Sequence, residues 1–186
     1  MAKVVVLYGS SRTTSNTELL TKKAIAGLDA KEIYLRDFTV KPIVDGRHTE
    51  HGFDEVDDDY DTIIKQVEQS DIILFSTPIY WYSMSGLMKN FIDRWSQTLR
   101  DPKFPDFKKN MSGKKAYVLA VGGDEPHMKG LAMIDQFRWI FQFVGMSFAG
   151  YIIGEGNKPE DILQDEMALL SAKKLNKELK AIKAAY

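Results

Sequence analysis

Short runs of apolar, β-favouring residues alternate with segments of helical periodicity, and this alternation constrains the fold more than any other feature of the chain. The runs occupy residues 4–8, 32–35, 72–77, 116–121 and 147–153. The cores of the third and fourth runs are continuously apolar, without the polar alternation of a strand that faces water on one side. Both faces of these strands are therefore predicted to be covered, as in a parallel sheet between two layers of helices.

The helical segments give the order of elements along the chain. Apolar residues recur at helical spacing over residues 16–28, 60–69, 84–99, 131–144 and about 160–186. The chain therefore reads as strand-helix repeated five times, which predicts an α/β, doubly wound, five-stranded parallel sheet with strand order 2-1-3-4-5 and helices on both faces. In that order the loops that follow Tyr8, Thr77 and Val121 share one edge of the sheet, where the ligand crevice opens.

Charge and cysteine content exclude several classes of protein. The 186 residues carry 25 Lys and Arg against 26 Asp and Glu, a net charge of −1, so no global field attracts a polyanion and we expect no nucleic-acid partner. The lysines of the last helix are interpreted as its solvated face. The chain has no cysteine, which excludes thiolate metal sites and cysteine nucleophiles. Any redox chemistry would need a bound cofactor.

The length and the termini suggest one compact unit. A chain of 186 residues has the size of one domain, so residues 1–186 are expected to form a single domain. The N-terminal apolar run is shorter than a signal peptide requires, and no apolar stretch reaches the roughly 20 residues of a membrane helix. We expect a cytoplasmic protein with no membrane span.

Residues 9–17 form a loop of small, hydroxylic and amide side chains with one arginine, Gly-Ser-Ser-Arg-Thr-Thr-Ser-Asn-Thr, between a buried strand and a helix start. Backbone N–H groups, hydroxyls and the positive end of a helix dipole together favour a phosphate. The loop is neither a Walker A sequence nor a Gly-x-Gly-x-x-Gly fingerprint. Ser15 to Glu18 also match a capping box that needs no ligand, but the box leaves Ser10 and Arg12 unexplained, and both interpretations can hold together.

The loop after the third strand is unusually aromatic. Pro78 and Ile79 are followed by Tyr80, Trp81 and Tyr82, where the sheet has already ended. Three consecutive aromatic side chains cannot all enter one core, so at least one is expected to face a flat ligand or a partner surface. For any single one of them, packing over the sheet edge is an equal alternative.

Together, residues 9–17 and 77–95 resemble the flavodoxin-like FMN-binding family of NAD(P)H-dependent oxidoreductases, which includes FMN reductases, quinone reductases and iron–sulfur flavoproteins. The resemblance extends from residue 3 to about 155. It implies a flavodoxin-like domain, bound FMN, and NADPH or NADH as a transient co-substrate. By the same resemblance, the residues that hold the FMN phosphate would be Ser10, Arg12, Ser15, Asn16 and Thr17, those that line the isoalloxazine would be Pro78, Ile79, Tyr80 and Trp81, and those near its polar edge would be Gly122, Gly123 and Asp124.

One departure from the family is informative. Residues 42–61 resemble the segment that carries a cysteine cluster in the iron–sulfur flavoproteins, but this chain has no cysteine. It therefore resembles a cluster-free relative that carries electrons on FMN alone. His48 and His51 could suggest a metal site there, but they lack helical ligand spacing, and we interpret the segment as a polar surface loop and expect no metal.

The resemblance implies an FMN-dependent NAD(P)H oxidoreductase that works by ping-pong hydride transfer and reduces a small-molecule acceptor, a quinone, flavin, nitro or azo compound. No catalytic acid or base is needed from the chain, and we assign none, although His127 is a weak candidate for contact with substrate.

Family members are commonly homodimers or homotetramers. Residues 100–110 could contact a second subunit or pack within the monomer, and Trp95 and Trp139 are expected in the core or at a subunit interface. The alternatives are a flavodoxin-type electron carrier, which the net charge of −1 disfavours, and a flavin-binding regulatory protein.

Overall fold

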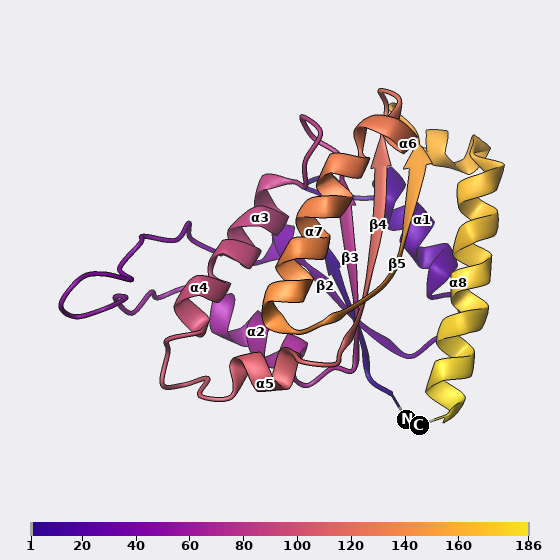
Figure 1. The fold of residues 1–186 in the computed structure, drawn as a ribbon. Helices are drawn as coiled ribbons and strands as arrows, with labels where there is room; N and C mark the ends of the chain where they lie inside the picture. The colour runs from indigo at the N-terminus through magenta and orange to yellow at the C-terminus, as the bar shows by residue number, and fades with distance from the viewer. Residues whose placement is uncertain (1, 186) are drawn as a thin grey trace.

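The computed structural model describes residues 2–185 and contains one five-stranded sheet (Figure 1). Its strands are β1 (Val4–Tyr8), β2 (Ala30–Tyr34), β3 (Ile72–Pro78), β4 (Lys115–Gly122) and β5 (Ser147–Glu155). Every neighbouring pair is parallel and the order is β2-β1-β3-β4-β5. The predicted fold class and strand order are confirmed.

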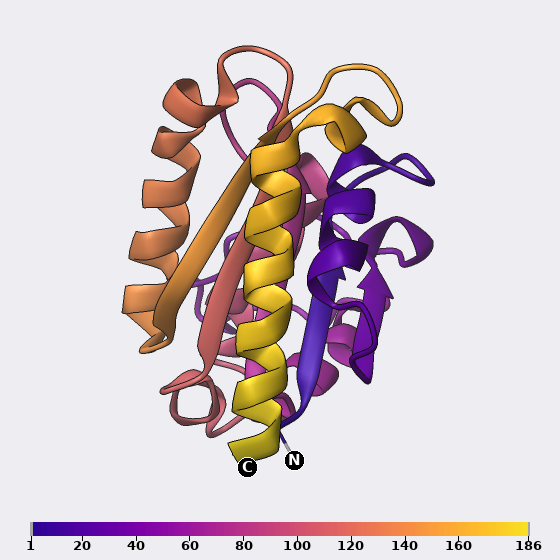
Figure 2. The same ribbon diagram turned by 90° about the vertical axis from the view of Figure 1, so that its right-hand side faces the viewer.

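Helices cover both faces of the sheet (Figures 1 and 2). One face carries α1 (Asn16–Ala24) and α8 (Glu166–Ala185), which pack against each other. The other carries α2 (Tyr60–Glu68), α3 (Gly86–Asp93), α4 (Trp95–Thr98), α5 (Phe107–Met111) and α7 (Leu131–Val144), while α6 (Pro126–Lys129) follows β4. Within residues 2–185, no helix is both long and apolar enough to cross a membrane.

The central strands are buried on both sides, as their continuous apolar sequence predicts. Every residue of β1 and β3 is buried. Successive side chains of a strand point to opposite faces. Val5 and Phe75 therefore belong to the core beneath α3 and α7, whereas Val6 and Leu74 belong to the core beneath α1 and α8. The two cores fix the sheet rigidly between its helices.

Three helices differ from their predicted extents. The first, expected over residues 16–28, ends at Ala24. The helix expected over residues 84–99 is interrupted at Arg94, whose backbone N–H is shared between the carbonyls of Asn90 and Ile92. The last helix begins at Glu166 rather than near residue 160, because Asp165 caps it by accepting from the backbone N–H of Ala168 at 2.9 Å. A short 3₁₀ turn, η2 (Asp161–Gln164), precedes this cap. The predicted end of that helix, Tyr186, lies outside the described residues.

The tryptophans and the aromatic stretch at residues 100–110 have different environments. Trp95 is 4% exposed and lies in the core, whereas Trp139 is 64% exposed and lies outside the core. Phe104 and Phe107 are buried in the core of their own chain. Packing within the monomer therefore explains the apolar character of residues 100–110.

A buried ion pair holds the long connection after β2 against the helices. Arg94 Nη1 lies 2.6 Å from Asp58 Oδ2, and both side chains are almost fully buried. The guanidinium also donates to the Lys41 carbonyl and lies over the Tyr60 ring. Burial alone would raise the pKa of Asp58, but hydrogen bonds from Arg94 and from the backbone amides of Lys41 and Tyr60 hold it below its usual range.

Asp58→Asn is expected to lower the free energy of unfolding by about 3–5 kcal/mol, because it leaves the Arg94 charge buried without a counter-ion. Urea denaturation at neutral pH measures this change. Asp45→Asn, which breaks the exposed pair with Arg47, is the matched control and should leave stability unchanged within error. Equal effects of the two substitutions would contradict a structural role for the buried pair.

The stabilisation by Asp58 should also depend on pH. A carboxyl whose pKa is lower in the folded than in the unfolded protein stabilises the fold fully at pH values above its pKa in the unfolded protein, near 4. This stabilisation is lost as the pH falls through the pKa of the folded protein. The stability difference between the native protein and Asp58→Asn should therefore be constant from about pH 5 to 7 and shrink in stronger acid. Urea titrations across this range measure it, and a difference that grows in acid would contradict the assignment.

Candidate cofactor site

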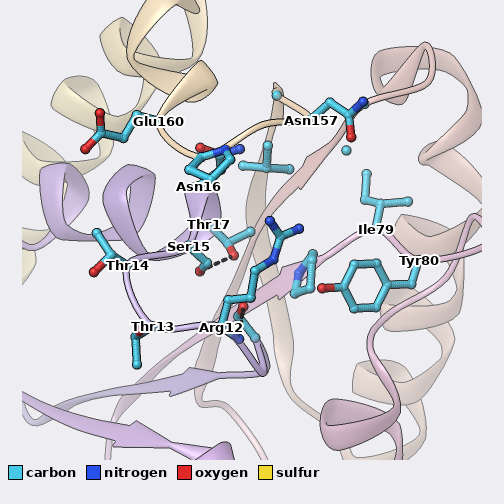
Figure 3. A pocket seen from close by; sticks show the side chains of 17 residues that line it. Arg12, Thr13, Thr14, Ser15, Asn16, Thr17, Ile79, Tyr80, Asn157 and Glu160 are labelled. Atoms are coloured by element: carbon cyan, nitrogen blue, oxygen red, sulfur yellow. Dashed lines mark hydrogen bonds between the residues drawn. The ribbon is translucent and has the colours of Figure 1, made fainter.

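The loops that follow β1, β3, β4 and β5 meet at the carboxyl edge of the sheet, as the strand order predicts, and enclose a cavity of about 330 Å³. This volume lies within the range of small-molecule sites. The lining, drawn in Figure 3, consists of Ser10, Arg12, Thr13, Thr14, Ser15, Asn16, Thr17, Pro78, Ile79, Tyr80, Val121, Gly122, Gly123, Gly156, Asn157, Pro159 and Glu160. All predicted site residues except Trp81 and Asp124 are in this lining.

The β1–α1 loop presents hydrogen-bond donors to the cavity. Ser15 is the N-cap of α1, and its hydroxyl accepts from the backbone N–H of Glu18 at 3.2 Å. Ser15 therefore caps the helix as predicted, but the Glu18 carboxylate accepts from Tyr34 Oη at 3.2 Å, so only the serine half of the predicted capping box is present. The N–H groups of Asn16 and Thr17, in the first helical turn, have no acceptor within the helix. These donors, the positive end of the helix dipole and the Arg12 side chain favour an anion at this point. Figure 3 shows Arg12 and Tyr80 pointing into the same space.

Asn16 connects this loop to the one after β5. Its Nδ2 donates to the Lys158 carbonyl at 2.8 Å, which fixes the orientation of the amide. Its Oδ1 is buried and accepts no hydrogen bond. A buried acceptor without a donor costs free energy that a ligand hydroxyl or N–H can recover.

The β1–α1 and β3–α3 loops are held together by Ser85. Its hydroxyl donates to the Gly9 carbonyl at 2.6 Å and, as the N-cap of α3, accepts from the Met88 N–H at 3.2 Å. A Cβ at Gly9 would lie 2.8 Å from Ser85 Oγ, so the contact requires glycine. The two loops therefore form a preorganised wall of the cavity.

The β4–α6 loop approaches its neighbours closely. A Cβ at Gly122 would lie 3.1 Å from the Ile79 Cβ, and a Cβ at Gly123 would lie 2.8 Å from the Asn157 Cβ. Glycine at both positions lets the backbone enter the cavity between the loops after β3 and β5. The Asn157 and Glu160 side chains complete the wall. Sequence reasoning missed both, although the topology places any residue that follows β5 at this same edge.

Backbone strain is concentrated around the cavity. Within residues 2–185, the non-glycine residues with left-handed φ are Thr14, Trp81, Tyr82, Glu125 and Glu160. Thr14 and Glu160 line the cavity, and the other three belong to the β3–α3 and β4–α6 loops, whose first residues line it. Strain of this kind persists where surrounding structure enforces it and is typical of functional sites.

Two predicted site residues, Trp81 and Asp124, and the substrate-contact candidate His127 lie outside the lining. Trp81 is 94% exposed at the tip of the β3–α3 loop. Asp124 accepts from Tyr82 Oη at 2.9 Å and from Lys129 Nζ at 2.7 Å, and the bonds from Lys129 and Tyr82 hold its pKa below the usual range. His127 lies with Nε2 4.0 Å from Asp165 Oδ2. Residues 2–185 contain no group of three or more His, Asp or Glu arranged to hold a metal ion.

A doubly wound parallel sheet of order 2-1-3-4-5, with its cavity at the topological switch point, defines a flavodoxin-like protein. Comparison with known proteins agrees: residues 2–156 match the family described as NADPH-dependent FMN reductase. The chain belongs to this family, and it is an enzyme of the NAD(P)H-dependent FMN oxidoreductase class. The predicted cofactor FMN and the NAD(P)H donor agree with that membership.

Individual relatives support the family. YwqN of Bacillus subtilis, which bears the provisional name of an NAD(P)H-dependent FMN-containing oxidoreductase, is 56% identical over 97% of this chain and 99% of its own. The structure of a Trp repressor binding protein from Bacillus subtilis is 51% identical, with a TM-score of 0.80 over 93% of this chain and 97% of that one. The iron–sulfur flavoprotein MJ1083 of Methanocaldococcus jannaschii is 27% identical over 95% of each chain.

The residues of the cavity fit FMN. The donors of the β1–α1 loop suit a phosphate. Pro78, Ile79 and Tyr80 supply an apolar and aromatic wall of the kind that a flat ring system needs. The close approach of Gly122 and Gly123 leaves backbone amides near the cavity.

Ser85→Ala is expected to lower the free energy of unfolding by about 1–3 kcal/mol, because it removes a helix cap and leaves the buried Gly9 carbonyl without its donor. Guanidinium denaturation of the apoprotein measures the change. Ser147→Ala, at an exposed position, serves as the control. A loss no larger than that of the control would show that the two loops do not depend on this contact.

Proposed function

We propose that this enzyme transfers hydride from NAD(P)H to FMN held in the cavity at the carboxyl edge of the sheet, and then reduces a small aromatic acceptor, a quinone, flavin, nitro or azo compound. The observation that carries this proposal is the meeting of a donor-rich loop, an aromatic strand end and a close-packed glycine loop around one cavity. Bound FMN would supply the chemistry, since its ring accepts a hydride and returns two electrons.

At the phosphate end, Arg12 would form a charge-assisted hydrogen bond. The N–H groups of Asn16 and Thr17 and the hydroxyls of Ser10 and Ser15 would supply further donors. Ser10 is 2% exposed and its Oγ already accepts from the Arg12 N–H at 3.2 Å, which orders the loop before a ligand binds. Arg36 donates to the Arg12 carbonyl at 3.2 Å and steadies the same turn. Preorganisation of this kind reduces the entropic cost of binding.

At the ring end, Pro78, Ile79 and Tyr80 would support the flat ring system, and Gly122 and Gly123 would present backbone to its polar edge. The cavity lining contains no histidine, and its one carboxylate, Glu160, lies in the loop after β5. We therefore assign no general acid or base. A quinone takes up two electrons and two protons, of which the hydride supplies one proton and solvent the other.

We also propose that the protein is cytoplasmic and that its chains, each a single domain of residues 1–186, form a homodimer or homotetramer. Trp139 and Phe143 lie on the outer face of α7 and are 64% and 63% exposed. Apolar side chains of this size on one helix face are typical of subunit contacts. Light scattering of the purified protein tests the oligomeric state, and a monomer at micromolar concentration would contradict it.

The test of function is steady-state oxidation of NADPH and of NADH by the FMN-loaded protein, with menadione as the quinone acceptor. We expect sustained turnover that requires the acceptor under anaerobic conditions, and parallel double-reciprocal plots, the signature of ping-pong kinetics. A flavin that neither nucleotide reduces would favour an electron carrier. A protein that stays colourless after FMN is supplied would favour a regulatory role.

Arg12→Ala is expected to weaken FMN binding about 10- to 100-fold, because one charge-assisted phosphate contact contributes about 1.5–3 kcal/mol. Fluorescence titration of the apoprotein with FMN measures the change, and Arg47→Ala, which removes an exposed arginine of the 38–59 connection, is the control. FMN affinity equal to that of the control would refute the phosphate role of Arg12.

A further inference from the structure

The aromatic loop after β3 ends in a strained two-residue turn. Tyr80 and Ser83 form an antiparallel bridge, with N–H to carbonyl distances of 2.9 and 3.0 Å. The two residues between them, Trp81 and Tyr82, have φ values of +49° and +63°. Turns of this type normally carry Asn-Gly, because both central residues must adopt left-handed backbone. Two aromatic residues at these positions are unfavourable unless other contacts hold them.

The contacts that hold the turn come from two other elements. Tyr82 Oη donates to Asp124 Oδ2 at 2.9 Å, and Lys129 Nζ donates to Asp124 Oδ1 at 2.7 Å. Lys129 Nζ also lies 6.0 Å from the centroid of the Tyr82 ring. On the other side of the turn, Ser83 Oγ donates to Gln136 Oε1 on α7 at 3.0 Å. The turn is therefore attached both to the β4–α6 loop and to α7.

These attachments cross the rim of the cavity. Tyr80 lines the cavity just before the turn, and Gly123 lines it just before Asp124. The hydrogen bond from Tyr82 to Asp124 thus joins the two loops at the edge of the site, and Figure 1 shows these loops side by side above the sheet. Each carboxylate oxygen of Asp124 already has a donor. Asp124 therefore attaches the β3–α3 loop to the β4–α6 loop, a role that differs from direct contact with a flavin.

We propose that Tyr82 and Asp124 are positioning residues that hold the strained turn so that Trp81 faces flat substrates entering the cavity. The inference rests on the proposed function. Trp81 is 94% exposed, so its indole gains no packing within the chain that would offset the strain of its backbone. A planar nicotinamide or quinone would supply the missing contact by stacking. Loss of the attachment would let the turn relax and would weaken substrate binding without changing the FMN phosphate site.

The test compares Tyr82→Phe and Asp124→Asn with matched controls in the FMN-loaded enzyme. Tyr151→Phe removes a hydroxyl from a tyrosine with the same 45% exposure, and Asp106→Asn neutralises another exposed aspartate beside a lysine. For Tyr82→Phe and Asp124→Asn, we expect KM for NADPH and for menadione to rise about fivefold to tenfold, as loss of one solvent-exposed hydrogen bond predicts. FMN affinity and kcat should stay within about twofold of wild type.

A second readout uses the apoprotein and needs no turnover. The indole N–H signal of Trp81 in a ¹H–¹⁵N spectrum, assigned by its disappearance in Trp81→Phe, should shift or broaden in Tyr82→Phe and Asp124→Asn but not in the controls. Unchanged KM values together with an unchanged indole signal would overturn the proposal. So would a loss of FMN affinity in Asp124→Asn that exceeds the change in KM, because it would make Asp124 a flavin ligand.

The outcomes separate this inference from the proposed function. If wild-type enzyme fails to oxidise NAD(P)H, the proposed function fails, and the indole signal alone decides whether Tyr82 and Asp124 hold the turn. If wild-type enzyme turns over and Tyr82→Phe matches Tyr151→Phe in both readouts, the positioning role fails while the oxidoreductase function stands.

Discussion

Every strand of the sheet is parallel to its neighbours, and the rest of the structure depends on this arrangement. Parallel strands need crossover helices on both faces, and these bury β1 and β3 completely. All strand-to-helix connections then start at one edge, where residues far apart in sequence share a cavity. The hydrogen bond from the Ser85 hydroxyl to the Gly9 carbonyl joins the connections after β1 and β3. These two connections therefore form a fixed wall of the cavity.

The division between core and edge explains where the chain tolerates strain. A left-handed conformation at a non-glycine residue costs about 1–3 kcal/mol, which a small protein sustains only where other interactions offset it. Here the two cores on either side of the sheet provide the stability, and the strained residues lie in the loops they support. The hydrogen bond from Tyr82 to Asp124 joins the strained Trp81–Tyr82 turn to the loop that contains the strained residue Glu125. Strain and attachment therefore occur together at the rim of the site.

The sequence predicts features that depend on local pattern. Continuous apolar runs identify β3 and β4 as doubly covered strands, and the Ser15 hydroxyl identifies the start of α1, since both effects arise within a few neighbouring residues. It does not predict contacts that only the tertiary fold creates. Tyr82 and Asp124 are 42 residues apart, and Asn157 enters the cavity only because β5 lies beside β4. The interruption at Arg94 likewise occurs where a buried ion pair forms with a residue 36 positions earlier.

The central claim is that the cavity holds FMN by its phosphate, through the donors of the β1–α1 loop. Parallel titrations of the apoprotein with FMN and with riboflavin test it most directly, because the two ligands share the ring and the ribityl chain and differ in the phosphate. The account predicts that FMN binds at least about 100-fold more tightly than riboflavin, as several charge-assisted hydrogen bonds to one phosphate require. Equal affinities would contradict it, because they would show that the FMN phosphate makes no favourable contact with this loop.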